Sequence, residues 1–275
     1  MKPIKLCQLF TPNDSYRPRA GWLVLAPILC CFAFRLHAID SNAVSASSGP
    51  AATNVAAPFK WGGGTKVLLV GGGSSHDFQK WFAEVDGATL RAAGKFSVNY
   101  TESSAMAAKA LVEAGVLVMS TNQKDFDTPE FRVALMTFAD SGKGIVLLHP
   151  AVWYNWPWPE YNARLVGGGS RAHESIGEFA VNVIKEHPVT FGLPPAFLVT
   201  DELYHVALDQ GAATEVLAQT SLARGAHQSY PSIWIVKHPA ARIVAIALGH
   251  DGRVHELPEF KRLLVNSVTW CAGGN

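Results

Sequence analysis

Short apolar runs alternate with segments of helical periodicity through the first half of the chain. Apolar positions recur at helical spacing from Phe78 to Leu90, a serine cap precedes MAAKALVEAG, and Thr128-Pro129 is typical of a helix start. Continuous apolar runs are typical of strands buried on both faces, whereas alternation indicates a half-buried strand. The predicted strands are KVLLV (66–70), FSVNYT (96–101), VLVMST (116–121) and GIVLLH (144–149). This order predicts βαβ units and a parallel sheet.

The second half of the chain has a different pattern. AVWYNWPWPEY is rich in aromatic residues and proline and is too irregular for one helix. Five strands with hairpin-like separations follow, and PEFKRLLVNSVTW predicts a final amphipathic helix. The five are EFAVNVI, FLVTDELYHVAL, TEVLAQTS, SIWIVKH and RIVAIALGH. We therefore expect an α/β fold, a doubly wound and mostly parallel sheet of flavodoxin-like type with an antiparallel extension, in one domain.

The N-terminus has the layout of a secretory signal. Basic residues precede the apolar run 22–34, and small residues follow it up to Ala46. The run is shorter than the ~20 residues of a spanning helix. We expect a signal peptide over 1–46 with cleavage between 38 and 46, a flexible linker over 47–59, and a domain over 60–275. The protein would then be periplasmic or secreted. An uncleaved membrane anchor is the alternative.

Charge and cysteine content narrow the possible partners. The chain has 23 basic and 22 acidic residues, a formal net charge of +1, so nothing indicates a nucleic-acid partner. Cys7, Cys30 and Cys31 fall in the predicted signal peptide. Cys271 remains in an apolar stretch, where we expect buried packing and no internal disulfide.

Five histidines follow predicted strands or glycine clusters. The carboxyl ends of parallel strands meet at one sheet edge, where open α/β sheets bind ligands. The five are His76, His149, His173, His205 and His250. His149 and His250, with Glu202 or His205, are the predicted catalytic residues. His149, His250 and Glu202 form the candidate site for zinc or a similar divalent ion, because two histidines and a carboxylate are its minimum ligand set.

Other residues are candidates for binding a substrate. His76 and His173 could contact substrate oxygens, and the ring of Trp153 could stack on a sugar. Asp201 and Tyr204, within DELYH, could add further polar contacts. Each motif also has a structural interpretation. GGGSSHDF could be a tight turn capped by Asp77 or a phosphate cradle, Asp251 could cap a turn, and the tryptophans could form a lid.

The ordered motifs resemble the ThuA-like (trehalose utilisation) family. They are the glycine-rich turn with HDF, GKGIVLLHPA, a GG loop followed by His, HPVTFGLP, DELYH and ALGHD, and they span about 65–272. The resemblance implies a class I glutamine amidotransferase-like fold without the Cys–His–Glu triad, with His149 where the cysteine would stand. It also implies a role in sugar catabolism through 3-keto intermediates, with metal in some members. GGGSS before His76 and the tryptophan-rich 153–158 loop are departures.

We therefore expect an exported enzyme that acts on a sugar or 3-keto-glycoside at the carboxyl strand edge, with isomerisation, hydrolysis and elimination all open. The expected partner is a small carbohydrate, with membrane contact only if the N-terminal segment stays uncleaved. The alternative is a non-catalytic sugar-binding module on the same scaffold.

Overall fold

A computed structural model describes residues 59–221 and 228–274. The predicted signal peptide (1–46) and almost all of the predicted linker (47–59) lie outside the described residues. Within the described residues, no helix has both the length and the apolar character that crossing a membrane requires.

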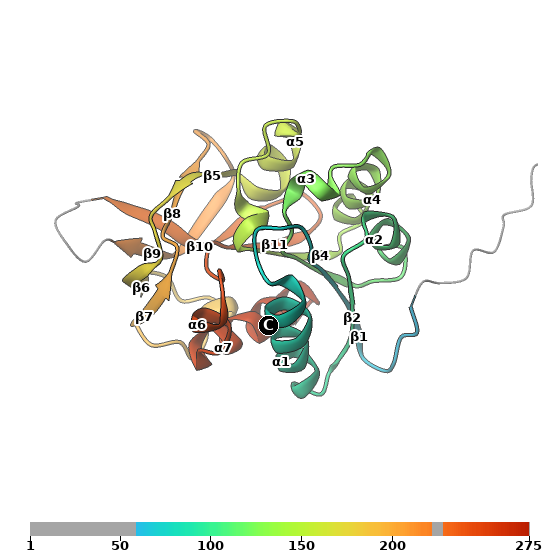
Figure 1. Cartoon of the computed structure of the whole chain (residues 1–275), viewed down its shortest axis with the longest axis horizontal. Helices are drawn as coiled ribbons and strands as arrows, with labels where there is room; N and C mark the ends of the chain where they lie inside the picture. The colour runs from blue at the N-terminus through green and yellow to red at the C-terminus, as the bar shows by residue number, and fades with distance from the viewer. Residues whose placement is uncertain (1–58, 222–227, 275) are drawn as a thin grey trace, which may run out of the picture. The chain divides into compact units, whose positions relative to one another are not determined.

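A nine-stranded mixed sheet forms the centre of the domain (Figure 1). Its order is β2-β1-β3-β4-β11-β10-β9-β6-β7. The first five strands in this order run parallel to one another, and β10, β9, β6 and β7 continue the sheet in antiparallel pairs. The parallel strands are β1 (Thr65–Val70), β2 (Phe96–Thr101), β3 (Val116–Met119), β4 (Gly144–Leu148) and β11 (Arg242–Ile246). The others are β6 (Gly177–Val183), β7 (Ala196–Asp201), β9 (Thr214–Ser221) and β10 (Ser229–Lys237).

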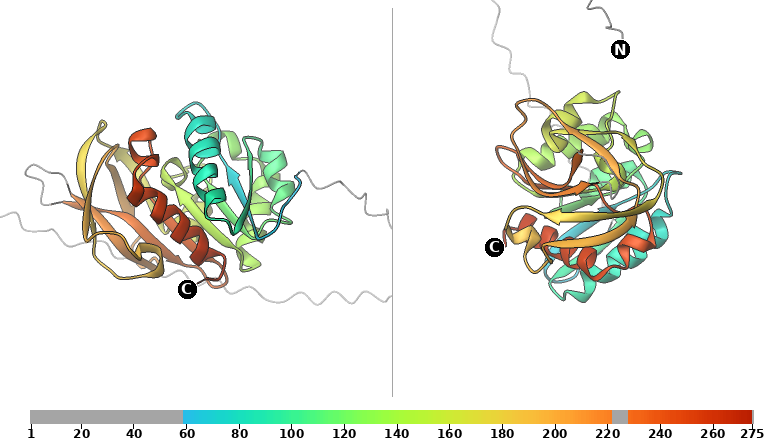
Figure 2. Two further views of the ribbon diagram at one scale, coloured as in Figure 1. Left: turned by 90° about the horizontal axis from the view of Figure 1, so that it is seen from below. Right: turned by 90° about the vertical axis from the view of Figure 1, so that its left-hand side faces the viewer.

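Helices cover both faces of the sheet (Figures 1 and 2). One face packs against the π-helix η1 (Gln79–Asp86), α1 (Gly87–Ala92) and α7 (Pro258–Cys271). The other packs against α2 (Ser104–Ala110), α3 (Gln123–Phe126), α4 (Pro129–Asp140), α5 (Pro159–Tyr161) and η3 (Asn162–Val166). Short turns of helix, η2 (His149–Val152), η4 (Pro188–Thr190) and α6 (Gly252–His255), follow strands.

The central strands are apolar throughout because each face buries alternate side chains. In β1, Val67 and Leu69 pack on the α7 side, whereas Leu68 and Val70 pack on the α4 side, and all four are at most 2% exposed. The predicted α/β class, the mostly parallel sheet and the antiparallel extension are confirmed.

Two local predictions are wrong. The segment FLVTDELYHVAL is not one strand, since β7 ends at Asp201 and β8 (Tyr204–Leu208) belongs to a separate two-stranded sheet. The break follows from Asp201, whose Oδ1 accepts a hydrogen bond from the next N–H, that of Glu202, at 2.9 Å. Residues 201–205 therefore do not form one continuous strand.

The glycine-rich stretch before His173 is a strand, where we expected a loop. β5 (Gly168–His173) pairs with β8 in the second sheet. Gly168 has φ +143°, and a Cβ there would lie 2.2 Å from the carbonyl oxygen of Ala207. Glycine is therefore needed for the close approach of the two strands.

Candidate active site

His149 occupies a strained position at the end of a central strand. Its φ is +39°, which makes it the one non-glycine residue with positive φ among the described residues. Such backbone strain persists only where the surrounding structure holds it, and it is concentrated at functional sites. The side chain is fully buried, and Nδ1 lies 2.8 Å from the carbonyl oxygen of Ala247. A carbonyl only accepts, so Nδ1 donates and Nε2 of the neutral ring keeps its lone pair.

His76 follows the glycine-rich turn after β1 and packs its ring beside His149 and His250, at centroid distances of 5.0 and 4.6 Å. Its Nδ1 lies 2.7 Å from Ser75 Oγ, and its buried Nε2 has no hydrogen-bond partner. Burial, followed by the nearby His149 and His250, lowers the pKa of His76 to about 3. The ring is therefore neutral at ordinary pH and its Nε2 can act as a ligand.

Glu202 lies at the break between β7 and β8 and faces two of these rings. Its Oε2 is 3.4 Å from His149 Nε2 and 3.2 Å from His250 Nδ1. Burial alone would raise the pKa of Glu202, but the contacts with His149 and His250 outweigh burial and lower it. The side chain is therefore a carboxylate at neutral pH.

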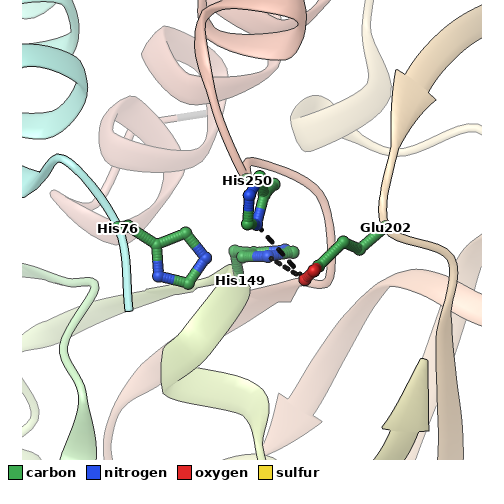
Figure 3. Close-up of side chains that lie close together, drawn as sticks. All are labelled: His76, His149, Glu202 and His250. Carbon is green, nitrogen blue, oxygen red and sulfur yellow. Dashed lines mark ion pairs between the residues drawn. The ribbon is translucent and has the colours of Figure 1, made fainter. Parts of the chain in front are cut away.

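These four side chains come from separate segments and point toward one another (Figure 3). One ligand atom from each, of His76, His149, Glu202 and His250, lies within 4.8 Å of all the others. His76 Nε2, His149 Nε2 and His250 Nδ1 are buried and make no hydrogen bond within the part of the chain that the structure describes. Unpartnered buried nitrogens are costly, and each calls for an explanation such as a bound ion.

The geometry fits a small divalent metal. Tetrahedral ligands at 2.0–2.1 Å from zinc are separated from one another by about 3.3–3.4 Å. The two Glu202 contacts already have this separation, at 3.2 and 3.4 Å. The widest pair, at up to 4.8 Å, would close by about 1.4 Å through small side-chain movements. Three imidazoles and one carboxylate form a donor set that suits zinc or a similar ion.

Asp201 is a buried carboxylate whose hydrogen bonds go to the backbone around this cluster. It is 1% exposed, and its carboxylate accepts hydrogen bonds from the N–H groups of Glu202, Gly249 and His250 at 2.8–3.0 Å. Burial raises the pKa of Asp201, and the three donors oppose that rise. Asp201, predicted to contact substrate, is thus bonded to the backbone of Glu202, Gly249 and His250.

A cavity of about 500 Å³ opens beside the cluster. Trp153, Tyr204, His173 and Glu202 line it, together with polar groups that include Ser75 and Thr121. Tyr204 packs against His149 with ring centroids 4.2 Å apart, and Trp153 meets both Tyr204 and His173 edge to face. Burial raises the pKa of the Tyr204 phenol, so it remains protonated. The cavity thus combines an aromatic wall with hydrogen-bonding groups.

The family model for ThuA, described as trehalose utilisation, matches residues 66–271. The chain belongs to the ThuA family. This membership supports a carbohydrate-related role. No curated protein gave a significant match.

Solved structures of ThuA-like proteins have the same fold. One from Parabacteroides merdae is 22% identical with a TM-score of 0.67, and the match covers 77% of this chain and 91% of that chain. One from Bacteroides uniformis is also 22% identical, with a TM-score of 0.62, covering 83% of this chain and 98% of that chain. A Thermoplasma acidophilum protein named as a GMP synthase subunit is 14% identical with a TM-score of 0.51. The match covers 76% of this chain and 94% of that chain. These similarities show the glutamine amidotransferase-like fold.

Most of the predicted site residues of this ThuA-family chain come together. His76, His149, His250 and Glu202 form the cluster, and His173, Trp153 and Tyr204 line the adjoining cavity. His173 also contacts the cluster, since its Nδ1 lies 3.4 Å from Glu202 Oε1. His76, predicted only as a substrate contact, is in position to be a fourth metal ligand.

His205, predicted as a catalytic residue, is not brought into the cluster. Its Nε2 lies 2.8 Å from Glu174 Oε1, and its ring stacks on Tyr230 at 4.6 Å. Since β8 starts a new sheet at Tyr204, His205 does not lie on the strand that leads to Glu202. Of the two alternatives, Glu202 and His205, the structure thus places Glu202 beside His149 and His250.

Sequence reasoning missed one buried pair. His255 had no supporting context in the sequence, yet it lies fully buried with Nδ1 2.8 Å from Asp86 Oδ1, and Asp86 is 1% exposed. The two residues are 169 positions apart, so no local pattern could connect them. Asp86 follows Phe82 by four residues on the buried face of η1, and an aspartate at such a position was the one available signal.

Two structural interpretations of the motifs also hold. Asp77 accepts from the N–H of Lys80 near the start of η1, and Asp251 accepts from Arg253 N at the start of α6. Cys271 is buried in α7 and its Sγ donates to Ile145 O, so it packs in the core. Cys7, Cys30 and Cys31 lie outside the described residues.

Proposed function

We propose that this protein is a metal-assisted enzyme that acts on a sugar or a 3-keto-glycoside at the carboxyl edge of the sheet. The observation that carries the proposal is the convergence of three unpartnered imidazole nitrogens and one carboxylate beside an aromatic cavity. Four protein ligands would fill a tetrahedral site, so a substrate oxygen or water from this cavity would enter either as a fifth ligand or by displacing one of the four.

The proposed ligands are His76, His149, Glu202 and His250. A divalent ion held there would act as a Lewis acid on a substrate oxygen or lower the pKa of a bound water. His149 is suited to this role because the hydrogen bond to Ala247 O fixes its tautomer.

Neighbouring groups would bind the substrate and move a proton. His173 lies between Glu202 Oε1, at 3.4 Å, and the cavity, so it is in position to exchange a proton with a bound substrate. Tyr204 remains a phenol and can donate a hydrogen bond. Thr121 has a buried hydroxyl without a partner, and it also lines the cavity. A substrate hydroxyl could satisfy this group.

The aromatic wall supports a carbohydrate as the substrate. Trp153 and Tyr204 offer apolar ring faces, while Asn122 and Gln123 lie on the same cavity. Sugar rings present C–H groups on their faces and hydroxyls around their edges, which matches this combination. The carbohydrate role of the family points to the same class of ligand.

The direct test is elemental analysis of the purified protein followed by turnover assays on 3-keto-glycosides, with and without chelator. We expect about one divalent ion per chain and turnover that chelation removes and the ion restores. A protein that turns over these compounds equally well after complete metal removal would contradict the metal-assisted mechanism.

A second experiment separates an enzyme from a sugar-binding module. His149→Ala should abolish turnover while sugar binding through Trp153 and Tyr204 persists. Measured turnover near zero in the wild type, with sugar affinity unchanged in the variant, would instead favour the binding module.

We also propose that the protein is exported, on the basis of the sequence pattern over 1–46. Cell fractionation and N-terminal sequencing of the mature protein test this proposal. We expect a new N-terminus between 38 and 46 and recovery in the periplasm or medium, whereas an intact Met1 in the cytoplasm would contradict export.

A further inference from the structure

The peptide group that leads into His250 is hydrogen-bonded on opposite sides by two buried side chains. The peptide between Gly249 and His250 donates its N–H to Asp201 Oδ1 at 3.0 Å. Its carbonyl oxygen, that of Gly249, accepts from His255 Nε2 at 3.0 Å. The N–H and C=O of a trans peptide point in opposite directions, so the two bonds together fix the plane of this peptide.

His255 is bonded at both ring nitrogens. The carbonyl of Gly249 can only accept, so Nε2 carries a proton, and Nδ1 faces Asp86 Oδ1 at 2.8 Å. Burial alone would lower the pKa of His255, but the charge and hydrogen bond of Asp86 outweigh burial and raise it. Phe82 and Phe260 pack edge-on against the ring, at centroid distances of 4.6 and 5.0 Å. The ring therefore has little freedom to turn away from Gly249.

Gly249 has a backbone conformation that favours glycine. Its φ is +124°, and a Cβ there would lie 3.4 Å from His255 Nε2 and 3.6 Å from His149 Cβ. The turn thus passes between the two histidines, one beneath the cluster and one within it. A small rotation of the peptide would move the next residue, His250, relative to His149.

The Asp86–His255 pair carries a cost that local stability does not explain. Both side chains are at most 1% exposed, and Asp86 Oδ2 is buried without a partner among the described residues. Replacing a buried ion pair with apolar residues is often neutral or stabilising, so such a pair is weak evidence for a stabilising role. The pair contacts the turn that carries His250, which indicates a role in holding that turn.

We propose that His255, oriented by Asp86, is a positioning residue that fixes the direction of the His250 imidazole within the four-residue cluster. The effect on metal binding rests on the proposed function. The clamp, meaning the two hydrogen bonds from His255 and to Asp201 that fix the Gly249–His250 peptide, does not. Loss of the Nε2 donor would free the carbonyl side of the peptide and leave Asp201 as its remaining support.

The test compares His255→Leu, which removes the donor, with His255→Gln, which keeps an N–H that can reach Gly249 O. Hydrogen exchange of the metal-free full chain is measured for the segment holding Gly249 and His250. We expect about 10-fold faster exchange there in His255→Leu than in the wild type, no change in the central strands, and near wild-type exchange in His255→Gln. His238→Leu is the matched control. His238 also bonds to the backbone of a turn, since its Nδ1 accepts from the N–H groups of Ala240 and Ala241 just before β11.

The second readout is affinity for zinc, measured by competition with a chelator. His255→Leu should weaken zinc binding by about 10-fold, the lower end for loss of an outer partner of a metal ligand. His255→Gln should restore most of it. If His255→Leu does not fold, the double variant with Asp86→Asn removes the unpaired carboxylate and takes its place.

Two results would overturn the clamp. One is unchanged exchange at residues 249–250 in a folded His255→Leu protein, and the other is an increase spread evenly over the domain. A wild type that binds no zinc, together with the local increase in exchange in His255→Leu, would contradict the metal proposal and leave the clamp standing.

Discussion

His149 Nε2 and Glu202 Oε2 lie 3.4 Å apart, although the two residues are carried by opposite halves of the domain. His149 directly follows β4 in the parallel part of the sheet, and Glu202 follows β7, the last strand of the antiparallel extension. The extension therefore contributes a residue to the site as well as enlarging the core. This relationship gives Glu202 the central place among the proposed ligands, since it also contacts His173 and His250.

Glu202→Gln tests whether Glu202 is a central ligand of the cluster. The substitution keeps the size of the side chain but removes the charge that faces three imidazoles. We expect affinity for zinc to fall by at least about 100-fold, the upper end for loss of an outer partner, because Glu202 is itself a proposed ligand. Competition with a chelator measures this affinity.

Glu174→Gln is the matched control for this prediction. Glu174 also pairs with a histidine, His205, at 2.8 Å, but outside the cluster. Its replacement should leave zinc affinity and turnover close to the wild-type values. Equal losses in the two variants would mean that the effect is one of general surface charge.

Trp153→Ala tests the aromatic wall. Trp153 contacts the rings of His173 and Tyr204 and lines the cavity. Loss of the apolar surface that it offers a sugar ring should cost about 1–2 kcal/mol of binding, which is about a 5–30-fold rise in Kd or KM. Trp156, at the rim and 67% exposed, is the comparison residue, and Trp156→Ala should have a smaller effect. Zinc affinity should stay unchanged in both variants, and a parallel loss of zinc would show that Trp153 supports the cluster instead.

Local sequence patterns were sufficient to predict the parallel half of the fold. The runs at β1, β3 and β4 are apolar because both faces of these strands are covered, and this burial leaves a direct signature in the sequence. The same strands lead to His76 and His149, so their convergence follows from the topology alone.

The features that were not predicted depend on long-range contacts. At the break before Glu202, Asp201 accepts N–H groups from Glu202 and also from the turn at Gly249, 48 residues away along the chain. His255 and Asp86 meet only because η1 and α6 pack together. The exclusion of His205 follows from the same break, since β8 pairs with β5 in its own sheet. Periodicity reports which residues are buried but not which buried polar groups are partners.

His76 predicts a pH dependence of stability. Its pKa is about 3 in the fold against an ordinary value of 6.5, so between these values the unfolded chain binds more protons. Stability should therefore fall as the pH drops from 6.5 toward 3. At pH 5 the loss from this residue should be on the order of 1 kcal/mol, after allowance for solvent screening of its partly exposed ring.

Urea denaturation with chelator present, at pH 7.5 and at pH 5, measures this loss. His76→Gln should show a smaller decrease in the free energy of unfolding than the wild type over the same interval. His205→Gln is a control, because the ring of His205 lies outside the cluster and pairs with Glu174. A decrease in His76→Gln as large as in the wild type would mean that other groups cause the acid sensitivity.

Removal and return of the metal should change thermal stability. An ion that binds the folded cluster and not the unfolded chain adds about 2.7 kcal/mol when its free concentration is 100 times Kd. For a domain of this size that corresponds to a rise in Tm of about 5–10 °C. Thermal unfolding of chelated protein, with zinc added back in steps, measures the shift. Glu202→Gln should lose most of the increase, and Glu174→Gln should keep it. A Tm that zinc leaves unchanged in the wild type would contradict binding at His76, His149, Glu202 and His250, whatever the catalytic role of these residues.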